Sequence, residues 1–185
     1  MSSSVEEAKN RADYAEAKSA QGFFKELIES VMAGQTAEFR SALSQYLEKH
    51  PHIDAEDVIK EFQSEGKTIL HLASSSGHVE SLRCVLEYVI DKRTFVNMQD
   101  KDGFTPLIYA TISESLDCMR ELVVSGADVN MSNKDGAAPI HFAAGDGSLL
   151  RAEFLIDSGA DTQLVSNSGS ALHWAAGKGR SEMIM

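Results

Sequence analysis

The feature that most constrains this chain is a short motif that recurs four times at a nearly constant spacing. Each copy opens with glycine and, a few residues later, has an aliphatic residue, usually a histidine, and then an alanine. The last three copies begin 33 residues apart, whereas the first begins 37 residues before the second. This period predicts a stack of similar units, each too small to bury its own apolar face. The copies are Gly66–Ala73, Gly103–Ala110, Gly136–Ala143 and Gly169–Ala175.

The residues of each unit favour two short helices joined by a tight turn. Thr105 and Pro106 are typical of a helix start, because threonine caps free amides and proline at the first helical position loses no hydrogen bond. Gly77 and Gly147 stand where the first helix must end. Apolar residues then recur at helical spacing through the second helix. We expect helix pairs at about 68–86, 105–125, 138–157 and 171–185, with almost no regular sheet.

The segments that end the units repeat at the same spacing as those that begin them, since Ser125–Asn130 matches Ser158–Thr162. With the segment Gly-Phe-Thr-Pro-Leu-Ile-Tyr-Ala at 103–110, these residues resemble the ankyrin-repeat family, whose pattern is G-x-T-P-L-H-x-A-A, a helix, and then G-A-D-V-N. The resemblance covers roughly residues 64–185. It implies an all-α ankyrin-repeat solenoid of stacked helix–turn–helix units with short hairpin-like turns, comprising three repeats and a truncated fourth.

Two departures from the family pattern fall in the second repeat. Ile108 replaces the motif histidine, which in the family hydrogen-bonds turns across neighbouring repeats, so we expect one such bridge to be missing. Glu114 replaces the glycine that ends the first helix, so a left-handed turn there would have to form without glycine. The first repeat carries four extra residues around Tyr88–Phe95, after its second helix.

The chain divides into three predicted parts. Residues 1–21 are expected to form a polar N-terminal helical arm, and residues 22–63 a degenerate capping repeat with a connecting helix. We expect Thr36 to cap the second helix of that repeat, and a short helix from Asp54 to take the place of a hairpin finger. Residues 64–185 hold repeats 1 to 4, the last incomplete, so we expect a fragment of a longer protein. A monomer is expected, and end-to-end association through the truncated C-terminus is the alternative.

Charge and composition limit the classes of partner that this chain is expected to bind. The formal net charge is −11 and no basic cluster is present, which argues against a nucleic-acid partner. No apolar run approaches the roughly 20 residues that span a bilayer, so no membrane partner is expected. Cys84 and Cys118 lack a CxxC partner and are interpreted as packed thiols of a reducing compartment. We therefore expect a cytoplasmic location, with the nucleus as a second one.

The sequence contains no recognisable catalytic, cofactor or metal motif. His71, His141 and His173 occupy one position of the motif, so structural hydrogen bonding explains them better than a metal site. Asp100–Gly103 resembles the start of a calcium loop but lacks the downstream ligands. We predict a non-enzymatic module without a cofactor.

The resemblance places partner binding on the concave face, which the turn tips and the first helices build. One variable position of the first helix forms an apolar and aromatic row, which favours partner anchoring, although packing between repeats would explain it equally well. The predicted partner-binding residues are Leu72, Lys101, Asp102, Phe104, Tyr109, Ile112, Lys134, Asp135, Phe142, Asp146, Trp174 and Lys178.

Two functions follow from the resemblance. The first is a protein–protein interaction module, an adaptor or scaffold that binds another protein. The alternative is the regulatory ankyrin domain of a larger enzyme, channel or co-chaperone whose active part lies beyond Met185. Asn130 also resembles the residue that asparaginyl hydroxylases modify in ankyrin hairpins, and a purely structural role in the turn is the competing interpretation.

Overall fold

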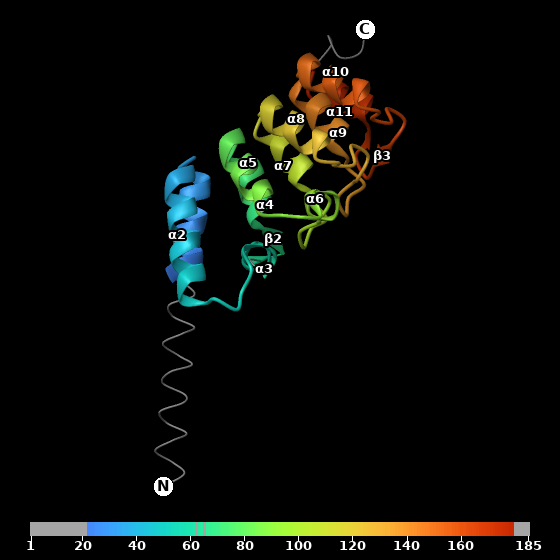
Figure 1. The fold of residues 1–185 in the computed structure, drawn as a ribbon. Helices are drawn as coiled ribbons and strands as arrows, with labels where there is room; N and C mark the ends of the chain where they lie inside the picture. Colours follow the sequence, from blue (N-terminus) through green and yellow to red (C-terminus); the bar gives the residue numbers. More distant parts are fainter. Residues whose placement is uncertain (1–21, 62, 65, 180–185) are drawn as a thin grey trace, which may run out of the picture.

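The computed structural model describes residues 22–61, 63–64 and 66–179, and within them it shows a curved stack of helix pairs (Figure 1). The first helices contact one another in chain order, and α5 packs against α8 in the outer layer. This arrangement confirms the all-α ankyrin-repeat solenoid. The expected arm at 1–21 and the second helix of repeat four, from residue 180 on, lie outside the described residues. The pairs are α4 (Ile69–Ser76) with α5 (Val79–Glu87), α7 (Pro106–Ile112) with α8 (Leu116–Val124), and α9 (Pro139–Asp146) with α10 (Leu149–Asp157), followed by α11 (Ala171–Gly177).

Another helix pair precedes the first clear repeat. A helix over 22–32 and α2 (Thr36–Lys49) flank a turn at Gly34, and α2 contacts α5. The expected cap is wrong by one residue, because Gln35 is the N-cap and Thr36 is already helical. Leu27, Phe39 and Leu43 are buried, so the pair joins the common core. The unit therefore extends the stack at its N-terminal end.

Short elements occupy the turns between helix pairs. The connecting helix α3 (Ala55–Glu61) does not replace a hairpin finger, because β1 (Gln63–Ser64) and β2 (Lys67–Thr68) form an antiparallel hairpin directly after it. Gly66 allows that tight turn with a φ of 78°. The extra residues of repeat one form α6 (Lys92–Val96). A second hairpin, β3 (Val165–Ser166) with β4 (Gly169–Ser170), precedes α11.

Neighbouring turns approach one another closely. A Cβ on Gly103 would lie 2.8 Å from the backbone nitrogen of Lys134, so only glycine lets these neighbouring turns approach. At the first-helix ends, Gly77 and Gly147 take positive φ values of 74° and 77°. Glu114 takes the same left-handed conformation with a φ of 60°. The turn after α7 therefore keeps the shape of its neighbours without glycine.

Motif histidines link successive repeats. His71 Nε2 lies 3.0 Å from the carbonyl oxygen of Phe104, and His141 Nε2 lies 3.0 Å from that of Leu164. Their Nδ1 atoms accept hydrogen bonds from the backbone of Thr68 and Ala138. The buried aliphatic side chain of Ile108 cannot form such a link, which confirms the missing bridge.

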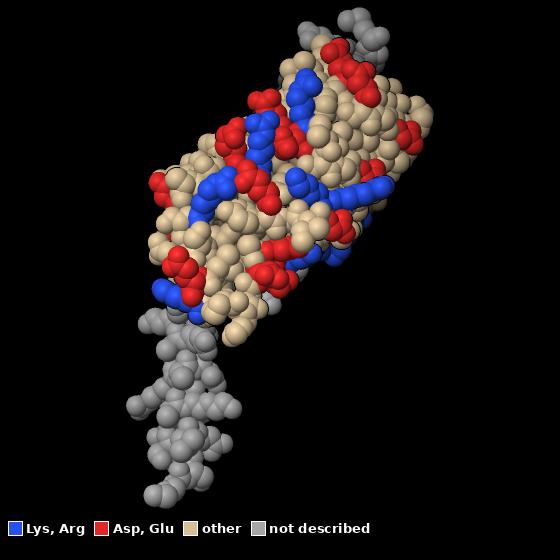
Figure 2. Space-filling model, in the orientation of Figure 1, with Lys and Arg blue, Asp and Glu red and all other residues tan. Residues whose placement is uncertain are grey.

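Charged side chains connect the outer helices. Arg40 Nη2 lies 2.6 Å from Glu87 Oε2, and Arg83 Nε lies 2.8 Å from Glu121 Oε2. Figure 2 shows basic and acidic side chains interleaved across the face in view. Exposed pairs of this kind add little stability each. Their repetition from α2 to α8 nevertheless favours one alignment of neighbouring units.

Candidate protein-binding surface

The predicted helix residues lie on one side of the stack. Leu72, Tyr109, Phe142 and Trp174 occupy equivalent positions of α4, α7, α9 and α11, and each is partly buried. The prediction therefore placed them together correctly. Their half-buried state means that each side chain packs against the stack and also presents some surface to solvent.

Four aromatic side chains form a continuous series, here called the aromatic row. Phe104 lies between Tyr109 and Phe142, with ring centroids 5.5 Å and 5.9 Å away. Phe142 then meets Trp174 at 5.3 Å with the rings nearly perpendicular. These separations are typical of favourable edge-to-face and tilted contacts. The row predicted from the sequence contained helix residues only. In the structure the turn residue Phe104 also belongs to it, between Tyr109 and Phe142.

Asp100 holds the Tyr109 end of the aromatic row. Its Oδ2 accepts a 2.8 Å hydrogen bond from the Tyr109 hydroxyl, and its Oδ1 accepts from the backbone nitrogens of Asp102 and Phe104. Burial acts to raise the pKa of Asp100, but these hydrogen bonds outweigh it and leave the pKa below its usual value. Asp100 is therefore a structural anchor of the turn.

The same position anchors the next two turns. Asn133 Oδ1 accepts from the backbone nitrogens of Asp135 and Ala137, and Ser166 Oγ accepts 3.0 Å from the indole Nε1 of Trp174. This position was not among those predicted from the sequence to be functional. Its signal was the recurrence of short polar side chains at a spacing of 33 residues.

Trp174 is fixed from three directions. Its indole nitrogen is bound to Ser166, its ring packs against Phe142 with a centroid separation of 5.3 Å, and the ring also lies next to Gly145. A Cβ on Gly145 would come within 3.1 Å of the ring, so the missing side chain makes room for it. A ring held in this way can bind a partner with little loss of conformational freedom.

Two hollows flank Trp174. The first has a volume of about 330 Å³ and lies among the rings of Phe104, Phe142 and Trp174 and the turn tips of repeats three and four, with Asp135 among its lining residues. The second, of about 370 Å³, lies between Trp174, His173 and Lys178. The predicted site residues Asp135, Phe104, Phe142, Trp174 and Lys178 are thus brought together.

The remaining predicted residues are more dispersed. Lys101, Asp102 and Lys134 are exposed at successive turn tips, where the backbone nitrogen of Lys134 donates to the carbonyl of Asp102. Ile112, which is 43% exposed, and Asp146 lie instead at the C-terminal ends of α7 and α9. They border the same side of the stack but do not line either hollow around Trp174.

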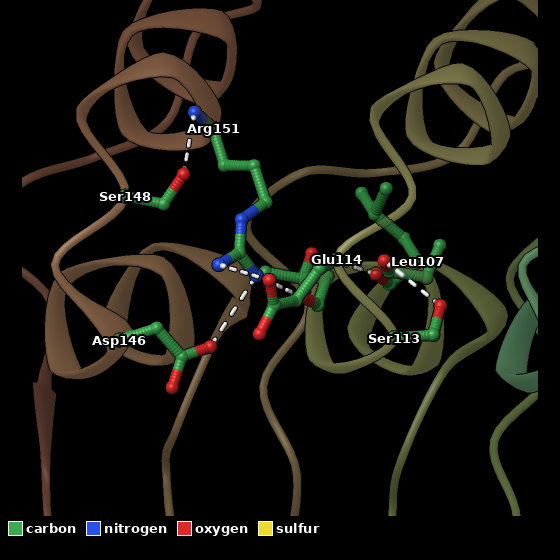
Figure 3. Close-up of polar contacts among 8 residues, drawn as sticks. Leu107, Ser113, Glu114, Asp146, Ser148 and Arg151 are labelled. Carbon is green, nitrogen blue, oxygen red and sulfur yellow. Dashed lines mark hydrogen bonds and ion pairs between the residues drawn. The ribbon is translucent and has the colours of Figure 1, made fainter.

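Arg151, which was not among the residues predicted from the sequence, is buried on α10. Figure 3 shows its guanidinium reaching from α10 toward the end of α7. Nη1 donates to the carbonyl oxygen of Thr111 and lies 3.3 Å from Asp146 Oδ2, while Nη2 lies 3.9 Å from Glu114 Oε2. Arg151 shares its helix position with Ser81 and Cys118, so the periodic pattern alone gave no reason to expect a long-range contact.

Asn130 links two turns through its side chain. Its Nδ2 donates to the carbonyl oxygen of Gly159 at 3.1 Å, and its Oδ1 accepts from the backbone nitrogen of Asp161 at 2.8 Å. Asn97 makes the same two kinds of bond one repeat earlier. The geometry therefore gives Asn130 a structural role.

Metal-holding clusters and membrane-spanning helices are both absent from the described ranges. Across residues 22–61, 63–64 and 66–179, no cluster of three or more histidine, cysteine, aspartate or glutamate side chains has the geometry to hold a metal ion. In the same ranges no helix combines the length and the apolar character that a bilayer crossing needs.

Comparisons with known proteins agree with this architecture. Residues 31–133 and 113–185 match the family profile described as ankyrin repeats (3 copies). A segment of 66 residues is 36% identical to E3 ubiquitin-protein ligase KEG of Arabidopsis thaliana, covering 36% of this chain and 4% of that protein. A segment of 70 residues is 34% identical to human (Homo sapiens) ankyrin repeat domain-containing protein 49, covering 38% of this chain and 28% of that protein. The matched segments thus span less than a third of either relative.

Proposed function

The chain belongs to the ankyrin-repeat family, whose repeats are generally protein–protein interaction modules, and we propose that it is a non-catalytic adaptor or scaffold that binds another protein. The observation that carries this proposal is the aromatic row, which is continuous across three repeats and partly exposed. Aromatic side chains held in place by their neighbours are frequent anchors of protein interfaces. No nucleic acid or membrane takes part in this proposed role.

The proposed surface combines these anchors with the charged turn tips. The rings supply apolar contact area, and the exposed tips supply charges that select and orient the partner. Lys101, Asp102 and Lys134 border the row on the side of the turns, and Leu72, Ile112 and Asp146 extend it along the first helices. The partner is bound by a monomer in this proposal.

The test is a double substitution, Phe104→Ala with Tyr109→Ala. Partner binding should weaken by about 2 kcal/mol, or roughly 30-fold, because two anchors are lost. The matched control is Val124→Ala with Leu150→Ala, which removes exposed side chains from the outer helices α8 and α10. Capture of cellular proteins followed by affinity measurement reads out the result, with circular dichroism confirming the fold of both variants. Equal partner capture by the two double variants would locate the binding surface elsewhere.

A second candidate is a regulatory ankyrin domain within a larger enzyme, channel or co-chaperone. What favours it is the relative named as a ubiquitin ligase, in which the similar segment is only 4% of the protein. The natural coding sequence past Met185 distinguishes the two functions, since a catalytic or channel domain there would support the regulatory role.

The cellular location and the modification of Asn130 are also proposals. The buried free thiols Cys84 and Cys118 suit a reducing compartment, so cytoplasmic location is proposed, with the nucleus as the alternative. Imaging of the tagged full-length protein tests this location. Hydroxylation of Asn130 stays a prediction from family resemblance, and intact-mass analysis of native protein that shows no added oxygen would rule it out.

A further inference from the structure

The first hollow beside Trp174 has an unusual combination of walls. Three aromatic rings from consecutive repeats, Phe104, Phe142 and Trp174, contribute to its lining. Aromatic ring faces carry partial negative charge and attract cations that come to lie over them. At about 330 Å³ the hollow falls within the size range of pockets that take small ligand groups.

Asp135 supplies the only formal charge among the residues that line this hollow. It is exposed at a turn tip, and its Oδ1 accepts a 3.3 Å hydrogen bond from the uncharged side-chain amide of Asn167. None of the ion pairs found among the described residues involves Asp135. Its negative charge is therefore available to a ligand.

The buried polar side chains of the hollow are already committed. Asn133 receives the backbone nitrogens of Asp135 and Ala137, while Ser166 receives the Trp174 indole and the backbone nitrogen of Ser168. What remains for a ligand is aromatic surface and one carboxylate, bordered by the exposed polar side chains of Asn167 and Ser168. That combination complements a flat, delocalised cation.

We infer that this hollow binds an arginine side chain presented by an extended segment of the partner protein, an inference that rests on the proposed function. A guanidinium stacks on aromatic faces and directs forked N–H groups at a carboxylate, here Asp135. It is also less strongly hydrated than an ammonium group, so it enters a partly apolar hollow more readily than lysine does. The fixed position of Trp174 means that the site needs no rearrangement to receive it.

Trp174 provides the readout, since it is the single tryptophan of the chain. The intact protein is titrated with the peptide acetyl-Gly-Ser-Arg-Ser-Gly-amide, and indole emission is followed. A saturable change in the millimolar range is expected. The same peptide with citrulline, which is neutral and nearly isosteric, should bind about tenfold more weakly, and the lysine peptide should lie between the two.

Matched variants test the carboxylate. Asp135→Asn keeps an acceptor for Asn167 but removes the charge, and should weaken arginine-peptide binding about fivefold without affecting the citrulline peptide. Asp157→Asn makes the same charge change at the end of α10, away from the hollow, and should leave both affinities unchanged. No saturable change with the arginine peptide, equal binding of the citrulline peptide, or equal effects of the two aspartate variants would each overturn the inference.

The two proposals fail in different ways. If the arginine peptide does not bind but Phe104→Ala with Tyr109→Ala still weakens partner capture, the arginine inference is wrong and the docking surface stands. If the arginine peptide binds as expected but the double variant captures partners normally, the hollow binds arginine and the docking surface built on Phe104 and Tyr109 is wrong.

Discussion

Arg151 on α10 donates a hydrogen bond to the carbonyl oxygen of Thr111, in the last turn of α7 and one repeat earlier in the stack. The last carbonyls of a helix lack partners within the helix, and a cation at that end also complements the helix dipole. One repeat earlier, the hydroxyl of Ser113 donates to the carbonyl of Ser74 at the end of α4. In both cases a side chain of the next repeat donates a hydrogen bond to a carbonyl at the end of a first helix. These bonds couple adjacent repeats.

Replacing Arg151 should therefore loosen the contact between repeats two and three. Arg151→Met keeps much of the side-chain volume but removes the charged donor to the Thr111 carbonyl, which keeps only the 3.2 Å bond from the backbone nitrogen of Glu114. We expect the free energy of unfolding to fall by about 2 kcal/mol, as for the loss of a buried hydrogen bond from a charged group. Urea denaturation followed by circular dichroism measures the loss. Glu114→Gln is the control, because that exposed carboxylate lies 3.9 Å away, and a similar loss there would contradict the role given to Thr111.

Glu114 itself carries a backbone cost. Its φ of 60° is unfavourable for any residue with a Cβ, and Gly77 and Gly147 occupy the equivalent positions of the neighbouring repeats. Glu114→Gly should raise the free energy of unfolding by about 0.5–1 kcal/mol, since relief of strain outweighs the added flexibility of the unfolded chain. Glu114→Ala keeps the strain and should give no gain. Equal denaturation midpoints for the two variants would show that the strain is not significant.

Periodicity predicted the parts of this molecule that repeat. The 33-residue spacing located the helix pairs and placed Tyr109, Phe142 and Trp174 in one row, because equivalent positions of a stack face the same way. The missing bridge at Ile108 also followed, since an aliphatic side chain cannot form a hydrogen bond. These predictions needed only the positions within a unit.

Side-chain contacts between different repeats could not be predicted from the spacing in the same way. Arg151 contacts Thr111 because its side chain is long and fits between α7 and α10. The spacing of residues in the sequence does not encode such a fit. Phe104 joins the aromatic row from a turn whose direction depends on stacking of the neighbouring turns. The hairpin of β1 and β2 was missed because each strand has two residues, too few for an alternating pattern.

The inter-repeat histidines predict a pH dependence of stability. Burial lowers the pKa of His71 and of His141, although the hydrogen bonds to the carbonyls of Phe104 and Leu164 act in the opposite direction. The unfolded chain, with histidine pKa values near about 6.5, therefore binds protons that the folded chain does not. Stability is fully present above about pH 6.5 and is lost as the pH falls below it, by at most about 1.4 kcal/mol per pH unit for each histidine.

The measurement is the denaturation free energy between pH 7.5 and 5. His71→Ile, which copies the residue of repeat two, should reduce the slope. Carboxylates such as Asp100, whose pKa is lowered, lose their stabilising effect only at more acidic pH and fall outside this window. An unchanged slope in His71→Ile would contradict the assignment.

The side chain of Asn130 should be needed for the alignment of the turns after α8 and α10. Asn130→Ala removes the donor to Gly159 and the acceptor for Asp161, and we expect a loss of about 1–2 kcal/mol in the free energy of unfolding. Asn97→Ala should cost a similar amount, because Asn97 bonds Gly126 and Asp128 in the same manner. Asn167→Ala is the control, since its exposed amide makes one 3.3 Å bond to Asp135, and a loss below about 0.5 kcal/mol is expected there. Faster hydrogen exchange at the Asp161 amide in Asn130→Ala would connect the loss to this bond, whereas unchanged exchange at that amide would show that the bridge contributes nothing.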